Sequence, residues 1–209
     1  MYKKLSDEKI NDMLRFGISE FADKGFGGAS LSSIAGKAGI SVGVIYKYFE
    51  DKESFFLECV RYSLKDLNNI LTAVAAESDS LKDSIKDLVH TLILYSREHE
   101  EENRLYSEIV SGRSEMSVML AREIEEISAM VYTDLVRKAM DEGMCRKDAD
   151  PSLFAFFFDN IFMMIQFSYN CEYYRERLKL YCGDSIFEDD ERMETELIRF
   201  ITGALGVMV

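Results

Sequence analysis

The sequence is poor in the residues that interrupt helices and in those that build most catalytic centres. It has one proline, 12 glycines and no tryptophan in 209 residues. Proline and glycine are the residues that helices tolerate least, so long stretches are free to be helical. Only two histidines occur, His90 and His99, and no glycine-rich phosphate loop or nucleophile–base pair is visible. We therefore predict an all-α protein that is not an enzyme; a helical enzyme using distant carboxylates is left open.

The four cysteines form no metal or disulfide pattern. Cys59, Cys145, Cys171 and Cys182 include no C-x-x-C pair, and the histidines complete no zinc-ligand spacing. The first ten residues contain lysines but no apolar run behind them, so we expect no signal peptide. The prediction is a cytoplasmic protein with reduced thiols, no metal and no cofactor.

The charge is acidic overall but unevenly distributed. The net charge is −13, yet residues 1–62 hold nine basic and nine acidic side chains, and the remainder holds 16 basic and 29 acidic ones. The amino-terminal part is therefore neutral, with lysines available for phosphates. An acidic second part would be repelled by DNA and would help to orient the first. The alternative is that the acidity serves solubility alone.

Residues 153–169 are apolar nearly all round, including six phenylalanines. Asp159, Asn160 and Gln166 interrupt the segment, which we judge too short and too polar to span a membrane. A helix that is apolar on most sides must be covered on most sides. We expect one face to pack inside the subunit and another to pack against a second subunit.

Residues 30–52 have the pattern of two short helices joined by a tight turn. Ser30 and Ser41 stand at N-cap positions, where a side-chain oxygen accepts a hydrogen bond from an amide of the first turn. Gly39 lies between them, where a left-handed residue is favourable. Such a pair is the helix-turn-helix arrangement, whose second helix enters a DNA major groove.

The same stretch resembles the signature of the TetR/AcrR family of bacterial transcriptional regulators. The resemblance covers residues 6–66 and is carried by Ala38–Ser41 (Ala-Gly-Ile-Ser), Gly43, Tyr46, Tyr48, Phe49, Lys52 and Phe55. It implies a three-helix helix-turn-helix DNA-binding domain at 1–50. It also implies a larger helical effector-binding and dimerisation domain at 51–209, with the helix at 51–76 connecting the two. Both domains together would have about nine helices.

The resemblance also assigns residues to DNA. The residues expected to face it from the second helix are Ser41, Val42, Gly43, Val44, Tyr46, Lys47 and Tyr48, and those expected at backbone phosphates are Ser30, Ser32 and Lys52. Many relatives carry a lysine or polar residue at position 42 and a threonine or serine at 44. Valine forms no hydrogen bonds with bases but packs on thymine methyl groups. We therefore predict recognition through methyl contacts and DNA shape.

For the second domain the resemblance implies a pocket for a small-molecule effector. The candidate lining residues are Tyr95, Met116, Met130, Tyr132, Phe158, Phe162, Met163, Gln166 and Tyr169. The predicted function is a ligand-responsive transcriptional regulator. It would be a homodimeric repressor that leaves its palindromic operator when a small apolar or cationic molecule binds. The alternative is an all-α interaction or sensor protein that does not bind DNA.

Overall fold

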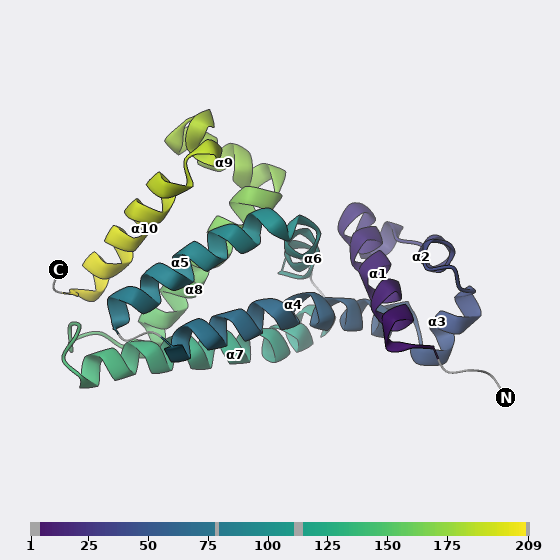
Figure 1. The fold of residues 1–209 in the computed structure, drawn as a ribbon, viewed down its shortest axis with the longest axis horizontal. Coiled ribbons are helices and arrows are strands. Elements are labelled where there is room, and N and C mark those ends of the chain that lie inside the picture. The colour runs from purple at the N-terminus through teal and green to yellow at the C-terminus, as the bar shows by residue number, and fades with distance from the viewer. Residues whose placement is uncertain (1–4, 78–79, 111–114, 208–209) are drawn as a thin grey trace. The chain divides into compact units, whose positions relative to one another are not determined.

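The computed structural model describes residues 5–77, 80–110 and 115–207, and within these ranges the fold is entirely helical (Figure 1). The helices are α1 (Asp7–Gly28), α2 (Leu31–Lys37), α3 (Val42–Tyr48), α4 (Lys52–Glu77), α5 (Leu81–Glu98), α6 (Glu100–Val110), α7 (Glu115–Asp141), α8 (Pro151–Asn170), α9 (Glu172–Cys182), the 3₁₀ helix η1 (Asp184–Glu188) and α10 (Asp190–Leu205). The predicted all-α class, with an amino-terminal helix-turn-helix, is confirmed.

The chain divides into two compact units. The amino-terminal unit comprises Met1–Asp66 and Glu101–Leu120, and the carboxyl-terminal unit comprises Leu67–Glu100 and Ala121–Val209. The continuous helix α4 runs through the boundary after Asp66, which agrees with the long helix expected at 51–76. The functional boundary at residue 50, between the DNA-binding domain and the effector-binding and dimerisation domain, stays a prediction.

Aromatic rings form the core of the amino-terminal unit. Phe21 of α1 meets Phe56 of α4 edge to face, with 4.9 Å between ring centroids, and lies 5.9 Å from Phe55. Helix α1 packs closely on α4 at Gly17, where an added Cβ would lie 2.5 Å from the sulfur of Cys59. Only glycine fits at this crossing, so Gly17 sets the distance at which α1 packs on α4.

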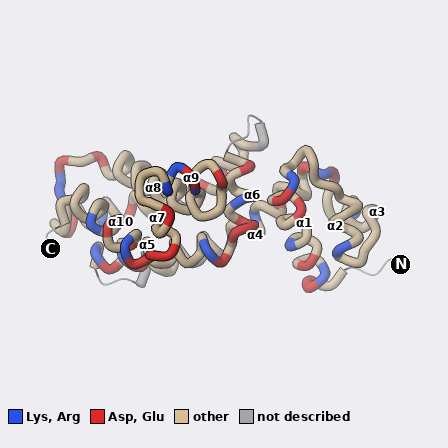
Figure 2. The backbone as a smooth tube through the Cα atoms, turned by 90° about the horizontal axis from the view of Figure 1, so that it is seen from above, with Lys and Arg blue, Asp and Glu red and all other residues tan. Residues whose placement is uncertain are grey.

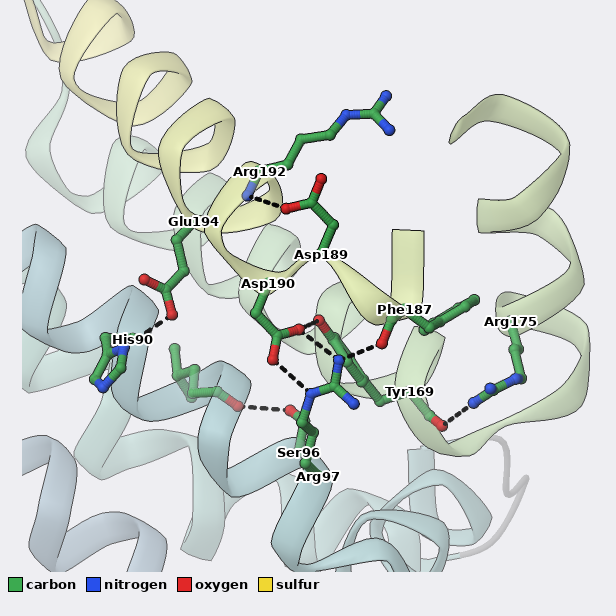
Figure 3. Close-up of polar contacts among 11 residues, drawn as sticks. His90, Ser96, Arg97, Tyr169, Arg175, Phe187, Asp189, Asp190, Arg192 and Glu194 are labelled. Carbon is green, nitrogen blue, oxygen red and sulfur yellow. Dashed lines mark hydrogen bonds and ion pairs between the residues drawn. The ribbon is translucent and has the colours of Figure 1, made fainter. Parts of the chain in front are cut away.

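The carboxyl-terminal unit is built around α5, which packs against both α8 and α10, while α9 packs on α8 (Figure 1). A polar network strengthens this arrangement (Figure 3). Both carboxylate oxygens of Asp190 accept hydrogen bonds from Arg97, at 2.7 and 2.6 Å. The Tyr169 hydroxyl donates to Asp190 at 3.0 Å. Burial opposes ionisation, but the bonds from Arg97 and Tyr169 lower the pKa of Asp190 overall. Asp190 therefore joins α5, α8 and α10 as a carboxylate.

Two helices differ from the sequence-based expectation. Helix α9 was not predicted, because none of its residues is buried and it has no apolar stripe to reveal its period. Helix α8 is 20 residues long with a mean hydropathy of 1.2, so by length and composition alone it could cross a membrane. The expectation that this segment is too short and too polar for a span is therefore wrong on those two measures. Its contacts with α5 and α9 are those of a helix packed within the protein.

Candidate nucleic-acid interface and effector site

The turn between α2 and α3 has the geometry that its sequence predicts. Gly39 has φ +65°, and the amide of Ile40 donates to the carbonyl of Ala35 at 2.9 Å. This is the left-handed helix ending that glycine favours. The Ser30 side chain caps α2 by accepting from the amide of Ser33 at 3.4 Å. Ser41 occupies the N-cap of α3, but its side chain makes no capping bond, so that part of the prediction is wrong.

Helix α3 is held to the protein by one fully buried side chain and leaves the rest of its surface accessible. Ile45 has no exposed surface, and Phe49, just after α3, is partly buried and packs on Phe55 with 5.0 Å between centroids. All ten residues assigned to DNA are exposed or partly exposed, and Tyr46 is the most exposed large side chain of α3, at 52%. Their contact with DNA remains a prediction, which this exposure permits.

Helix α1 and the residue just before it also hold the two short helices, α2 and α3, by hydrogen bonds. The amide of Leu5, just before α1, donates to the hydroxyl of Tyr48 at 2.7 Å, and the ammonium of Lys9 donates to the carbonyl of Ala38 at 3.3 Å. Tyr48, predicted to face DNA, therefore has a structural partner as well. Its hydroxyl hydrogen remains a possible donor, because in this bond the oxygen is the acceptor.

Glu20 is a buried carboxylate that the sequence-based interpretation missed. Its side chain is 1% exposed and lies beside α2. It accepts from Lys24 at 2.6 Å, from the Ser33 hydroxyl at 2.9 Å, from Lys37 at 3.2 Å and from the backbone amide of Ser30 at 3.4 Å. The bond from Lys24 is the main cause that lowers the pKa of Glu20 to about 2, against the opposing effect of burial. Glu20 thus anchors the start of α2 to α1.

Lys52, expected at a phosphate, lies at the first position of α4. Its ammonium lies 5.0 Å from the centroid of the Phe26 ring, a distance at which a cation is attracted to an aromatic face. The ring therefore restricts where this charge is placed. Figure 2 shows basic and acidic segments interspersed over the amino-terminal unit, in line with the equal numbers of basic and acidic side chains in residues 1–62.

The structure places the nine candidate pocket residues in several different environments. Tyr132, Phe158, Phe162 and Gln166 are all buried, and the rings of Tyr132 and Phe162 lie 5.7 Å apart. Met163 on the same helix is partly exposed. Tyr132 of α7 therefore meets Phe162 of α8, and the other three residues lie on α8 near Phe162 in sequence.

The remaining four candidates are in other environments. Tyr95 is buried and stacks on His99, with 4.0 Å between centroids, and Tyr169 belongs to the Asp190 network. Met130 is 59% exposed, because it lies two residues from both Ser128 and Tyr132 and so on the opposite side of α7. The side chain of Met116 lies outside those that the structure describes.

Two carboxylates of the same region were not among the predicted site residues. Burial, and to a smaller extent the charge of Glu125, together raise the pKa of Asp159 to about 7. Burial, Asp159 and Glu125, in that order, also raise the pKa of the Tyr132 hydroxyl. The interruption of the apolar segment by Asp159 was the sequence signal that could have identified this site.

Comparison with known proteins agrees with this geometry. Residues 14–59 match the sequence family described as "Bacterial regulatory proteins, tetR family". This segment includes α2, α3 and the turn between them. The uncharacterized HTH-type transcriptional regulator YerO of Bacillus subtilis is 26% identical over 155 residues, which are 71% of this chain and 53% of YerO. The match thus spans about half the length of that relative.

A second relative is matched over more of its length. The biofilm operon icaADBC HTH-type negative transcriptional regulator IcaR of Staphylococcus aureus is 23% identical over 153 residues, which are 72% of this chain and 81% of IcaR. Among solved structures, that of AibR in complex with isovaleryl coenzyme A and operator DNA has a TM-score of 0.68 and 14% identity. It covers 92% of this chain and 97% of AibR, which shows a shared fold.

An all-α chain with an exposed recognition helix after a glycine turn defines a helix-turn-helix regulator. Within that class, residues 14–59 match the tetR family of bacterial regulatory proteins, and the relatives named above are helix-turn-helix regulators to which this chain is similar.

Proposed function

We propose that this protein is a ligand-responsive transcriptional regulator that binds double-stranded operator DNA as a homodimer. The observation that carries the proposal is the surface of α3, which is anchored by Ile45 while Tyr46 and its predicted DNA-facing neighbours stay accessible. IcaR is named a negative transcriptional regulator, and AibR was solved in complex with isovaleryl coenzyme A and operator DNA. These relatives support a repressor that leaves its operator when a small molecule binds the carboxyl-terminal unit.

The protein would act by binding and not by catalysis, in the cytoplasm where bacterial DNA lies. Two copies of α3 would enter successive major grooves, about 34–36 Å apart on one face of the duplex, which requires a palindromic operator. Ser30, Ser32 and Lys52 would contact phosphates, and Val42 and Val44 would pack on thymine methyl groups.

The exposed phenylalanines of α8 and α10 support the homodimer. Phe156 and Phe157 of α8 are 59% and 52% exposed, and Phe200 of α10 is 61% exposed. Large apolar side chains that gather on an outward helix face mark interaction surfaces. A second copy of the chain would cover them, and an isologous dimer has the two-fold symmetry that a palindrome demands.

A gel-shift titration with fragments of the source genome tests DNA binding. We expect one or a few fragments to bind specifically, with an affinity that falls by an order of magnitude or more when salt is raised from 50 to 200 mM, because counterions are released. Absence of specific binding at low salt would contradict the proposal and would favour the interaction protein that does not bind DNA.

Sedimentation equilibrium tests the dimer. The double variant Phe156→Ser/Phe157→Ser should shift the protein toward monomer and weaken operator binding. Leu180→Ser is the matched control, because Leu180 is 86% exposed but lies on α9; this variant should remain dimeric. A double variant that dimerises as well as the control would show that the interface lies elsewhere.

A further inference from the structure

The buried carboxylate of Glu20 gathers two lysines beside a predicted DNA contact. Its Oε1 accepts from the ammonium of Lys24 at 2.6 Å and from the backbone amide of Ser30 at 3.4 Å. Its Oε2 accepts from the hydroxyl of Ser33 at 2.9 Å and from the ammonium of Lys37 at 3.2 Å. Ser30 is expected at a backbone phosphate. Both ammonium groups therefore lie around the same carboxylate as the backbone of that residue.

The two lysines remain accessible to a ligand, although the sequence did not assign either of them to DNA. The side chains of Lys24 and Lys37 are 44% and 48% exposed, whereas that of Glu20 is 1% exposed. An ammonium group carries three hydrogen-bond donors, and the bond to Glu20 uses one of them in each lysine. The other donors can meet an anion from the solvent while the carboxylate stays covered.

The shared carboxylate fixes two lysines that come from different helices. Lys24 lies four residues after Glu20 on α1, and Lys37 is the last residue of α2. An exposed lysine adopts many rotamers, and ordering it when a partner binds reduces the affinity. A lysine that a buried acceptor already holds has been ordered in the unbound protein. Lys52, the lysine expected at a phosphate, is likewise placed by a neighbour, the ring of Phe26.

The charge of Glu20, taken alone, opposes DNA binding, because phosphates repel a carboxylate. The cluster is still cationic, since two ammonium groups surround one carboxylate. Loss of the Glu20 charge would make the cluster more positive, and this effect alone would tighten binding to DNA. Loss of the order that Glu20 gives to the lysines would weaken it. The charge effect and the positioning effect therefore have opposite signs.

We propose that Glu20 is a positioning residue for DNA binding, and that Lys24 and Lys37 are phosphate contacts that it holds beside the start of α2. The proposal rests on the proposed function, because it extends the DNA interface of a regulator. The occupant is the backbone phosphate, since an ammonium group recognises this charge and not the sequence of bases. The two lysines contribute affinity and salt dependence, with little effect on sequence preference.

Glu20→Gln tests the positioning role, since it keeps the shape of the side chain and removes its charge. The probe is a duplex that the wild-type protein selects from random sequences, and fluorescence anisotropy on the full chain measures its dissociation constant. Circular dichroism establishes the temperature at which each variant is folded. We expect Glu20→Gln to bind about fivefold more weakly than the wild type or weaker still, because two lysines must be ordered on binding.

Glu8→Gln is the matched control for the loss of a negative charge, because Glu8 is exposed on the same helix. This variant should bind the duplex as tightly as the wild type does, or more tightly. A Glu20→Gln protein that also binds as tightly as the wild type, or more tightly, overturns the proposal, because the charge effect would then be the larger one.

The salt dependence of binding tests the two lysines, and it decides the proposal even where Glu20→Gln does not fold. Each lost phosphate contact reduces the slope of log affinity against log salt by about one. We expect this reduction in Lys24→Gln and in Lys37→Gln. Lys65→Gln is the control, because Lys65 is exposed on α4 and outside the cluster, and its slope should match the wild type. An unchanged slope in either lysine variant overturns the assignment of that lysine, and in both it overturns the proposal.

The same measurements separate this proposal from the proposed function. Specific binding by the wild-type protein, with equal affinity and slope in Glu20→Gln and both lysine variants, would leave the proposed function standing and reject this inference. Failure of the wild-type protein to select any duplex would reject the proposed function, and with it the role of Glu20 in DNA binding.

Discussion

Replacing Glu20 by glutamine should destabilise the amino-terminal unit in a way that depends on pH. The variant keeps the shape of the side chain but removes the charge that accepts from Lys24, Lys37 and the start of α2. In the folded protein the pKa of Glu20 is lowered from 4.5 to about 2. One pKa unit corresponds to about 1.4 kcal/mol, so the full shift corresponds to about 3 kcal/mol.

That figure is a ceiling, because the two lysine side chains are 44% and 48% exposed and solvent screens their charges. We expect Glu20→Gln to lower the free energy of unfolding by about 1–2 kcal/mol at pH 7. A lowered pKa stabilises the folded state above the unfolded value of 4.5, and this contribution is lost as the pH falls towards 2. The difference between variant and wild type should therefore shrink over that range.

Urea unfolding followed by circular dichroism, at one protein concentration and at several pH values from 7 to 3, measures this difference. Glu176→Gln is the matched control. Glu176 also pairs with a lysine, Lys179 at 2.6 Å, but its side chain is 67% exposed, so the effect should stay below about 0.5 kcal/mol. A Glu20→Gln difference that is absent at pH 7, or that stays constant down to pH 3, would refute the reasoning.

Two further predictions concern the recognition helix and the carboxyl-terminal unit. Val42→Ala should change the sequence preference among selected duplexes more than Lys52→Ala does, because valine is predicted to pack on thymine methyl groups whereas Lys52 is expected at a phosphate. An equal, sequence-independent loss of DNA affinity in both variants would contradict this prediction. Arg97→Ala should lower the free energy of unfolding by about 1–3 kcal/mol, because it leaves the Asp190 carboxylate without its bidentate partner. Thermal unfolding checks this, and an unchanged midpoint would contradict it.

The turn of the helix-turn-helix could be predicted because its signals are local. Gly39 and the cap position of Ser30 determine the backbone nearby, whatever lies further along the chain. The side-chain bond expected at Ser41 is absent, although the residue stands at the predicted position. A cap position can therefore be read from sequence more easily than the rotamer that a serine adopts there.

The burial of individual side chains was harder to predict, because it depends on neighbours that are distant in sequence. On α7 the buried stripe runs through Ser128, Tyr132 and Val136, whereas the neighbouring apolar residue Ile127 is 37% exposed. A stripe through Ile127 would lie one residue away, and apolar character alone cannot choose between the two. Glu20 was missed for a related reason, since its four partners come from α1, α2 and the intervening turn.

The effector pocket stays a prediction. Among its candidate residues, Tyr132, Phe162 and Gln166 are buried, and the rings of Tyr132 and Phe162 are in contact. Asp159 was treated only as an interruption of an apolar segment. A charged residue in such a segment is costly to bury, and this cost is the physical reason to examine it as a site.

Gly43→Ala provides the most direct test of the central claim, that α3 enters DNA. An added Cβ at Gly43 would have the Ser41 hydroxyl, at 3.8 Å, as its nearest neighbour, so the protein has room for it, and alanine favours a helix by about 1 kcal/mol over glycine. Gly36→Ala is the matched control, because an added Cβ there meets nothing within 4 Å and Gly36 is outside the predicted DNA-facing set.

The measurement is the dissociation constant for a selected operator by fluorescence anisotropy, with thermal stability recorded alongside. Our account predicts that Gly43→Ala binds at least tenfold more weakly while it unfolds no earlier than the wild type, because the methyl group meets the duplex. Gly36→Ala should bind as the wild type does. Unchanged operator affinity in Gly43→Ala would contradict the placement of α3 in the groove.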